Sequence, residues 1–120
     1  MNLKAQNTLN RIKDLIKAVA SLIDEFPKKT AAFKIAGQIM DSVTSIGANF
    51  VEAQSARSKK EFISTMGIVL KETKETLFWL EIIQELNLTS KEKIDKIHKE
   101  CSELAKIFTS SIMTASKKLK

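Results

Sequence analysis

Residues that break helices are scarce in this chain, which has three Gly and one Pro in 120 residues. Strand-type alternation is almost absent, and apolar residues recur at spacings of three and four, which places them on one face of a helix. In the first segment this spacing runs from Ile12 to Phe26. Pro27 lacks an N–H and clashes with the preceding turn, so that helix should stop at or before Phe26. The pattern therefore predicts an all-α fold.

Local signals divide the rest of the chain. Ser58 with Glu61, and Thr89 with Glu92, have the spacing of capping boxes, in which a hydroxyl and a carboxylate satisfy free N–H groups at a helix start. Asn87 is a suitable left-handed residue at a helix end. We predict a single domain over residues 1–120 that forms an antiparallel up-down-up-down four-helix bundle, with helices at about 3–26, 30–56, 59–86 and 90–118.

Composition narrows the class of protein. The hydrophobic share is 43% and the charged share 28%, which is typical of a globular chain. A single Cys excludes an intrachain disulfide framework and fits a reducing compartment. The apolar runs are far shorter than the ~20 residues of a membrane span. We expect a soluble, cytoplasmic protein with no membrane partner.

Catalytic and metal-binding patterns are missing from the sequence. The chain has one His and one Cys, His98 and Cys101, whereas zinc needs three or four ligands from His, Cys or carboxylate side chains. Neither a Gly-x-Ser-x-Gly motif nor a Gly-rich phosphate loop occurs. Cys101 falls on an apolar stripe, where a thiol tends to be inert. We expect no enzyme activity, no metal, no cofactor and no small-molecule substrate.

Positive charge is the more informative feature. The net charge is +6, and residues 1–60 hold ten Lys and Arg against five acids. Such a surplus can neutralise phosphates, although a solubilising surface explains it equally well. Only two of the twenty cations are Arg and Tyr is absent, so contact with RNA or DNA should be non-specific. The candidate phosphate-binding residues are Arg11, Lys13, Lys17, Lys28, Lys29, Arg57, Lys59 and Lys60.

The second predicted helix carries two apolar stripes where one amphipathic helix needs only one. One stripe includes Phe33, Met40 and Val43, and the other includes Ile35, Ile39 and Ile46. The third helix also has a spare apolar set. Either the core is wide or the surplus faces a second copy of the chain. The candidate interface residues are Ile35, Ile39, Ile46, Asn49, Glu52, Ile63, Leu70 and Phe78.

A family resemblance rests on three stretches of residues 45–80. These are Ser-Ile-Gly-Ala-Asn-Phe-Val-Glu-Ala at 45–53, Ser-Lys-Lys-Glu-Phe at 58–62 and Lys-Glu-Thr-Lys-Glu-Thr-Leu-Phe-Trp-Leu at 71–80. They resemble the bacterial four helix bundle protein family. Its first known members are encoded by intervening sequences in large-subunit ribosomal RNA genes, and a relative is the accessory variability protein of diversity-generating retroelements.

The resemblance implies a compact antiparallel bundle that assembles into a homopentamer, with no catalytic residues. It also implies RNA and a reverse transcriptase as partners, because the retroelement relatives bind both. Two hypotheses therefore stand beside each other: a homo-oligomer with a basic surface that associates with RNA or DNA, and a purely structural protein–protein scaffold without nucleic-acid contact.

Overall fold

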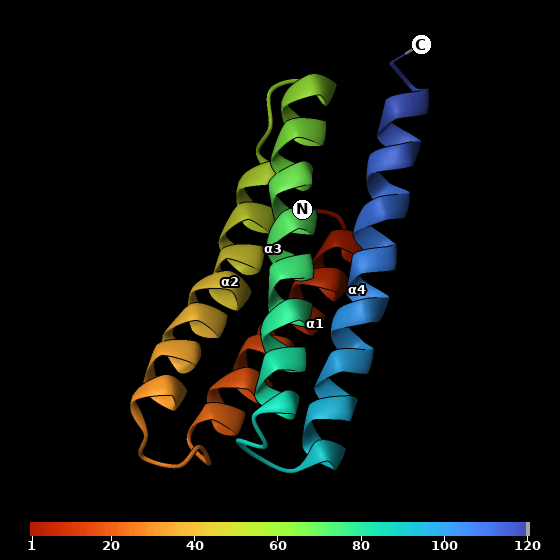
Figure 1. Cartoon of the computed structure of the whole chain (residues 1–120). Helices are drawn as coiled ribbons and strands as arrows, with labels where there is room; N and C mark the ends of the chain where they lie inside the picture. The colour runs from red at the N-terminus through yellow and green to blue at the C-terminus, as the bar shows by residue number, and fades with distance from the viewer. Residues whose placement is uncertain (120) are drawn as a thin grey trace.

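The computed structural model describes residues 1–119 as four antiparallel helices (Figure 1). They are α1 (Leu3–Ile23), α2 (Thr30–Gln54), α3 (Lys59–Glu85) and α4 (Lys91–Lys117). α1 packs against α2 and α4, and α3 packs against the same two helices, while helices on the diagonals make no close backbone approach within the described part. The bundle measures 50 × 22 × 20 Å. The predicted all-α, up-down-up-down bundle is confirmed.

α1 ends at Ile23, three residues earlier than its apolar stripe predicts. The amides of Glu25 and Phe26 donate to the carbonyls of Leu22 and Ile23, each at 3.1 Å. Both hydrogen bonds join residues three apart, as in a 3₁₀-helix, so the α-helix ends in a tighter turn just before Pro27. The proline therefore acts over a full turn ahead of itself.

The starts of α3 and α4 are both capped by a serine, but neither has the capping box that the sequence predicts. Ser58 Oγ accepts from the Glu61 amide at 3.1 Å, but the Glu61 carboxylate accepts from the Arg57 amide at 2.9 Å, where Ser58 was expected. At α4 the capping residue is Ser90, whose Oγ accepts from the Lys93 amide at 3.3 Å, one residue later than predicted. Both carboxylates still lie in the first turn of their helix, where they interact favourably with its dipole. Asn87 has φ of 52°, the left-handed conformation expected there.

The core runs the full length of the bundle and takes side chains from both apolar stripes of α2, among them Ile39 from one and Val43 from the other, each 0% exposed. Ile35, Ile39 and Ile46 have exposed fractions of 8%, 0% and 0% inside a single chain. Their assignment to an interface is therefore wrong, because the surfaces of these side chains are already used by the core. Phe33, from the other stripe, is 69% exposed.

Gly47 permits the close approach of α1 to α2. A Cβ at this position would lie 3.2 Å from Ile16 Cδ1 and 3.4 Å from Ile12 Cγ2. The two helices thus meet where the α2 surface has no side chain, and the Ile12 and Ile16 side chains fill that space.

Among residues 1–119, no helix is both long and apolar enough to cross a membrane.

Candidate nucleic-acid interface

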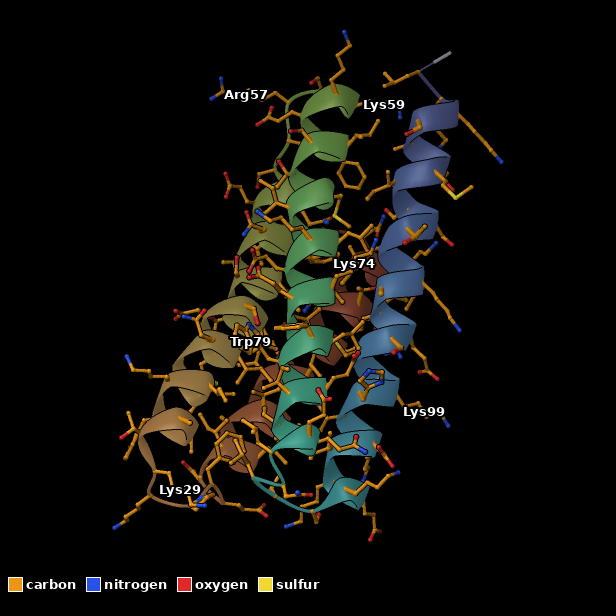
Figure 2. The ribbon with its side chains drawn as sticks, in the orientation of Figure 1. Lys29, Arg57, Lys59, Lys74, Trp79 and Lys99 are labelled. Atoms are coloured by element: carbon orange, nitrogen blue, oxygen red, sulfur yellow. The ribbon has the colours of Figure 1, made fainter. Side chains whose placement is uncertain are left out.

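The eight predicted phosphate-binding residues do not form one patch. Lys28 and Lys29 lie in the α1–α2 loop, and Arg57 precedes α3 in the α2–α3 loop. These loops stand at opposite ends of a molecule 50 Å long, as Figure 2 shows for Lys29 against Arg57 and Lys59. Lys13 and Lys17 are exposed along α1 between the two ends.

Arg11 is engaged within the protein. Its Nε donates to Glu100 Oε2 at 3.0 Å, and its Nη2 donates to Glu100 Oε1 and to Glu103 Oε2. This forked arrangement joins α1 to α4 and offsets the charge of the guanidinium. Arg11 therefore contributes to the packing of the bundle, and its role as a free phosphate ligand is not supported by the geometry.

This ion pair gives stability a defined pH dependence. The hydrogen bond from Arg11 lowers the pKa of Glu100 below its ordinary value of 4.5 in the folded chain. The folded state then binds fewer protons than the unfolded state, so the stabilisation is complete above pH ~5 and disappears as the pH falls through the lowered pKa. The hydrogen bond from Lys93 likewise lowers the pKa of Glu25.

We expect Arg11→Gln to lower the free energy of unfolding by about 0.5–1 kcal/mol at pH 7, because both side chains are partly exposed. The loss should vanish near pH 2. Urea unfolding at both pH values measures it, with the exposed Lys17→Gln on the same helix as control. An equal loss at pH 2 would show that Arg11 acts through packing alone.

The excess charge is concentrated at the α2–α3 end of the bundle. We define the basic end as residues 1–8, 50–67 and 105–119, which the antiparallel topology brings together. It holds seven Lys and Arg against two Glu, whereas residues 9–49 and 68–104 hold twelve cations and twelve acids. The net charge of +5 at this end accounts for nearly all of the total of +6. The seven cations are Lys4, Arg57, Lys59, Lys60, Lys106, Lys117 and Lys118.

The residues missed by the sequence analysis are Lys4, Lys106, Lys117 and Lys118. All four are exposed and come from α1, from α4 and from the residue that follows α4. Comparing the two sequence halves hides this cluster, because every helix has one end at each end of the bundle. Counting charge by helix end, once the topology is predicted, finds it.

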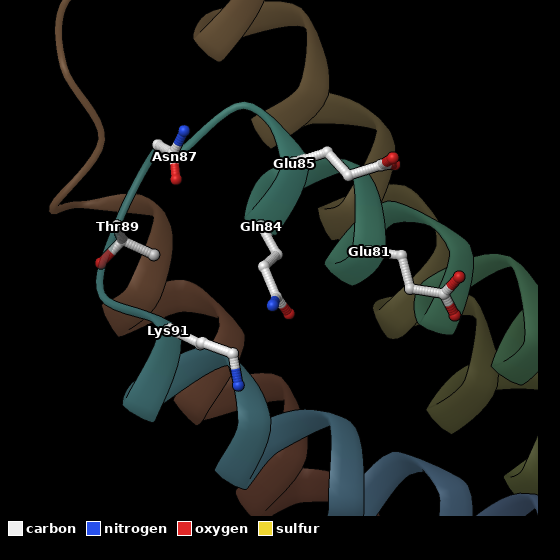
Figure 3. Close-up of a pocket in the computed structure, with 6 residues that line it drawn as sticks. All are labelled: Glu81, Gln84, Glu85, Asn87, Thr89 and Lys91. Carbon is white, nitrogen blue, oxygen red and sulfur yellow. The ribbon is translucent and has the colours of Figure 1, made fainter.

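A hollow of about 580 Å³ lies at the opposite end, beside the turn between α3 and α4 (Figure 3). Its side chains are Glu81, Gln84, Glu85, Asn87, Thr89 and Lys91. Glu81 also contacts His98 Nε2 at 3.3 Å on the flank of α4. Carboxylates and one lysine are mixed here, so this end offers no comparable site for an anion.

The thiol of Cys101, the one cysteine in the sequence, is buried in the core. Its side chain is fully buried, its Sγ lies 3.6 Å from the Thr73 carbonyl, and burial raises the pKa of the thiol to about 12. A thiol with that pKa has almost no thiolate at neutral pH, so it is a poor nucleophile. Within residues 1–119, no group of three or more His, Cys, Asp or Glu side chains is placed to hold a metal ion.

The other predicted interface residues lie at or near the surface of α2 and α3. Phe78 is 51% exposed and Glu52 is exposed, while Ile63 and Leu70 are half-buried. Asn49 is half-buried, and its Nδ2 donates to the carbonyl of Ser45 at 2.9 Å. Further exposed apolar side chains on these two helices are Phe33, Val51 and Ile68.

Taken together, the fold and the basic end define the class of this protein as a small all-α protein with a charge-segregated surface. Residues 4–110 match the family of 23S rRNA-intervening sequence proteins, and the chain belongs to that family. It is also similar to a crystal structure of a protein with unknown function from the S23 ribosomal protein family of Bacteroides thetaiotaomicron VPI-5482. That likeness has 30% sequence identity and a TM-score of 0.84, and covers 92% of this chain and 99% of the other. No curated protein matches the chain.

Proposed function

We propose that this protein is a non-enzymatic homo-oligomer that binds the phosphate backbone of RNA or DNA through the basic end. The observation that carries the proposal is the segregation of charge. The basic end holds seven cations and two acids, whereas residues 9–49 and 68–104 hold equal numbers of cations and acids. A surface of one sign attracts a polyanion over a distance of about a Debye length, which a mixed surface does not.

The chemistry of these cations favours binding without sequence preference. Six of the seven are Lys, which acts as a point charge, and Arg57 is the single guanidinium among them. Reading a base edge typically uses forked Arg contacts or paired amides in a groove. The protein would thus be an accessory to an RNA, such as the intervening sequence for which its family is named, and a reverse transcriptase is the second partner that the family resemblance predicts.

Self-association is the second part of the proposal. With the buried isoleucines of α2 removed from the candidate set, the interface that we propose uses the apolar side chains that α2 and α3 leave at the surface. Glu52, Asn49, Ile63 and Leu70 complete it on the same two helices. The family resemblance supplies the expected number of five subunits.

The charge hypothesis is tested by two triple variants that remove the same charge. Arg57→Gln, Lys59→Gln and Lys60→Gln remove three cations from the basic end, and Lys29→Gln, Lys74→Gln and Lys99→Gln remove three exposed lysines elsewhere (Figure 2). Binding to a 30-nucleotide single-stranded RNA is measured by filter retention over a range of salt. We expect the first triple to weaken binding about tenfold or more, and to reduce the slope of log K against log salt by about 2.

The control triple should change the slope little. Equal losses in both triples would mean that net charge alone drives binding, and the basic end would then have no special role. Binding that does not respond to salt would remove phosphate contact from the proposal altogether.

A further inference from the structure

α1 is too short to cover the basic end. It has 21 residues where α3 and α4 have 27 each, a difference of about 9 Å at 1.5 Å per residue. In Figure 1 the N-terminus accordingly lies well below the upper ends of α3 and α4. The start of α1 therefore leaves a space between itself and the upper ends of α3 and α4, and a groove of about 830 Å³ that all four helices line occupies this space.

The groove has an apolar floor and a cationic rim. Its apolar surface comes from Phe62 and Ile107, which are half-buried, and from the small side chains of Ala53 and Ala115, with the fully buried Met66 also in the lining. Small residues on the walls, such as Ser111, keep the groove open. All the charged residues that line it are cations, namely Lys4, Arg57, Lys59, Lys106 and Lys118.

We propose that this groove binds an amphipathic helix of a partner protein, with an apolar stripe toward the floor and Asp or Glu toward the rim. The groove has room for about two turns of such a helix, because a segment about 10 Å wide and 10 Å long occupies roughly 800 Å³. The partner helix takes the place that a longer α1 would have filled, and packs by the same apolar contacts as the rest of the bundle. This goes beyond phosphate binding, because the floor, and not only the charge, selects the ligand.

A nucleic acid suits this groove less well. Bases need an exposed aromatic face for stacking, and of the three rings that line the groove Phe50 and Phe108 are 5% and 0% exposed and Phe62 is half-buried. A second copy that docks by its own basic end brings cations against cations, which is unfavourable. The occupant that complements both the cationic rim and the apolar floor is an acidic amphipathic helix, which we place in a different protein.

The probe is a 14-residue, end-capped, fluorescein-labelled peptide with Leu at helical spacings of three and four and Glu at most other positions. A scrambled peptide of identical composition is its control. Binding is followed by anisotropy with the full chain. We expect the patterned peptide to bind at least tenfold more tightly than the scrambled one, because only the former presents a continuous apolar stripe.

Two sets of variants separate floor from rim. Ala56→Phe with Ser111→Phe fills the groove and keeps every cation, and should weaken peptide binding about tenfold and RNA binding by a much smaller factor. Lys59→Gln with Lys118→Gln removes charge from the rim. This variant should bind the peptide several-fold more weakly, and its affinity should depend less on salt. If RNA affinity fell in the filled variant as much as peptide affinity, the groove and the phosphate site would be the same site, and the proposal of a separate helix ligand would be overturned.

A measurement on the unaltered chain guards against a filled variant that does not fold. With methyl-labelled Met, the patterned peptide should shift the Met66 signal, which lines the groove, and leave that of Met40 in place. Equal binding of the scrambled peptide, a silent Met66 signal, or a Met66 shift caused only by the RNA would overturn the proposal.

Discussion

Phe108→Ala should lower the free energy of unfolding by about 3–5 kcal/mol, the range for removing a fully buried aromatic ring. Phe108 is 0% exposed, and its ring centroid lies 6.0 Å from that of Phe50 at a tilt of 43°. This contact joins α4 to α2 across the diagonal of the bundle, where the two backbones do not approach each other. A loss of this size is a large part of the stability of an ordinary domain.

Urea unfolding followed by circular dichroism measures the change. Met113→Ala, on the same helix at 56% exposed, is the matched control and should stay within about 0.5 kcal/mol of the natural chain. A loss below about 1.5 kcal/mol for Phe108→Ala would indicate that the core beneath the groove closes over the gap, and so is not tightly packed at that end.

Phe33→Asp and Phe78→Asp should each shift the assembly toward single chains in sedimentation velocity at micromolar concentration. Both rings are more than half exposed in one chain and neither belongs to the core, although Phe78 also contacts the ring of Trp79 at a centroid distance of 5.1 Å. An Asp at a buried subunit interface leaves a charge without water or a partner, which costs several-fold more than losing the ring itself. We expect at least a hundredfold rise in the dissociation constant where the ring is central to the contact.

Met113→Asp again serves as control, since it places the same charge on an exposed apolar site of α4. If both phenylalanine variants keep the mass of the natural assembly, the interface does not include these parts of α2 and α3. A natural chain that sediments as one copy would contradict self-association itself.

The positions of the helices could be predicted because their signals are local. Pro27, the Ser58 cap and the left-handed Asn87 each act within a few residues, and the observed ends differ from the predicted ones by three residues or fewer. The shifts that did occur, such as the cap at Ser90, reflect a choice between two neighbouring hydroxyls that only the geometry of the loop decides.

The inward face of α2 could not be chosen from the sequence. Its two stripes are similarly apolar, and the core takes residues from both, so the inward face matches neither stripe alone. Ser42 on the inward side accepts or donates a 2.9 Å hydrogen bond with Thr76 of α3, and Gly47 fits against α1. Ser42, which is polar, and Gly47, which has no side chain, thus lie at the contacts of this helix. A search for apolar residues alone overlooks both.

The basic end could be anticipated only in part, for a similar reason. Arg57, Lys59 and Lys60 are adjacent in sequence and were found, but the lysines of α4 join them through the topology. Arg11 is offset by Glu100, which is 89 residues away, so no local pattern shows that this cation is engaged.

A 50 Å rod with its surplus charge at one tip has a large electric dipole along its length. That dipole turns the molecule as it nears a polyanion, so the tip arrives first and the encounter rate falls with added salt. In a ring of parallel subunits all tips share one side, and the ring has a binding side and a neutral side. In an antiparallel pair the moments cancel and the two tips point apart, which would let one dimer bridge two separate strands.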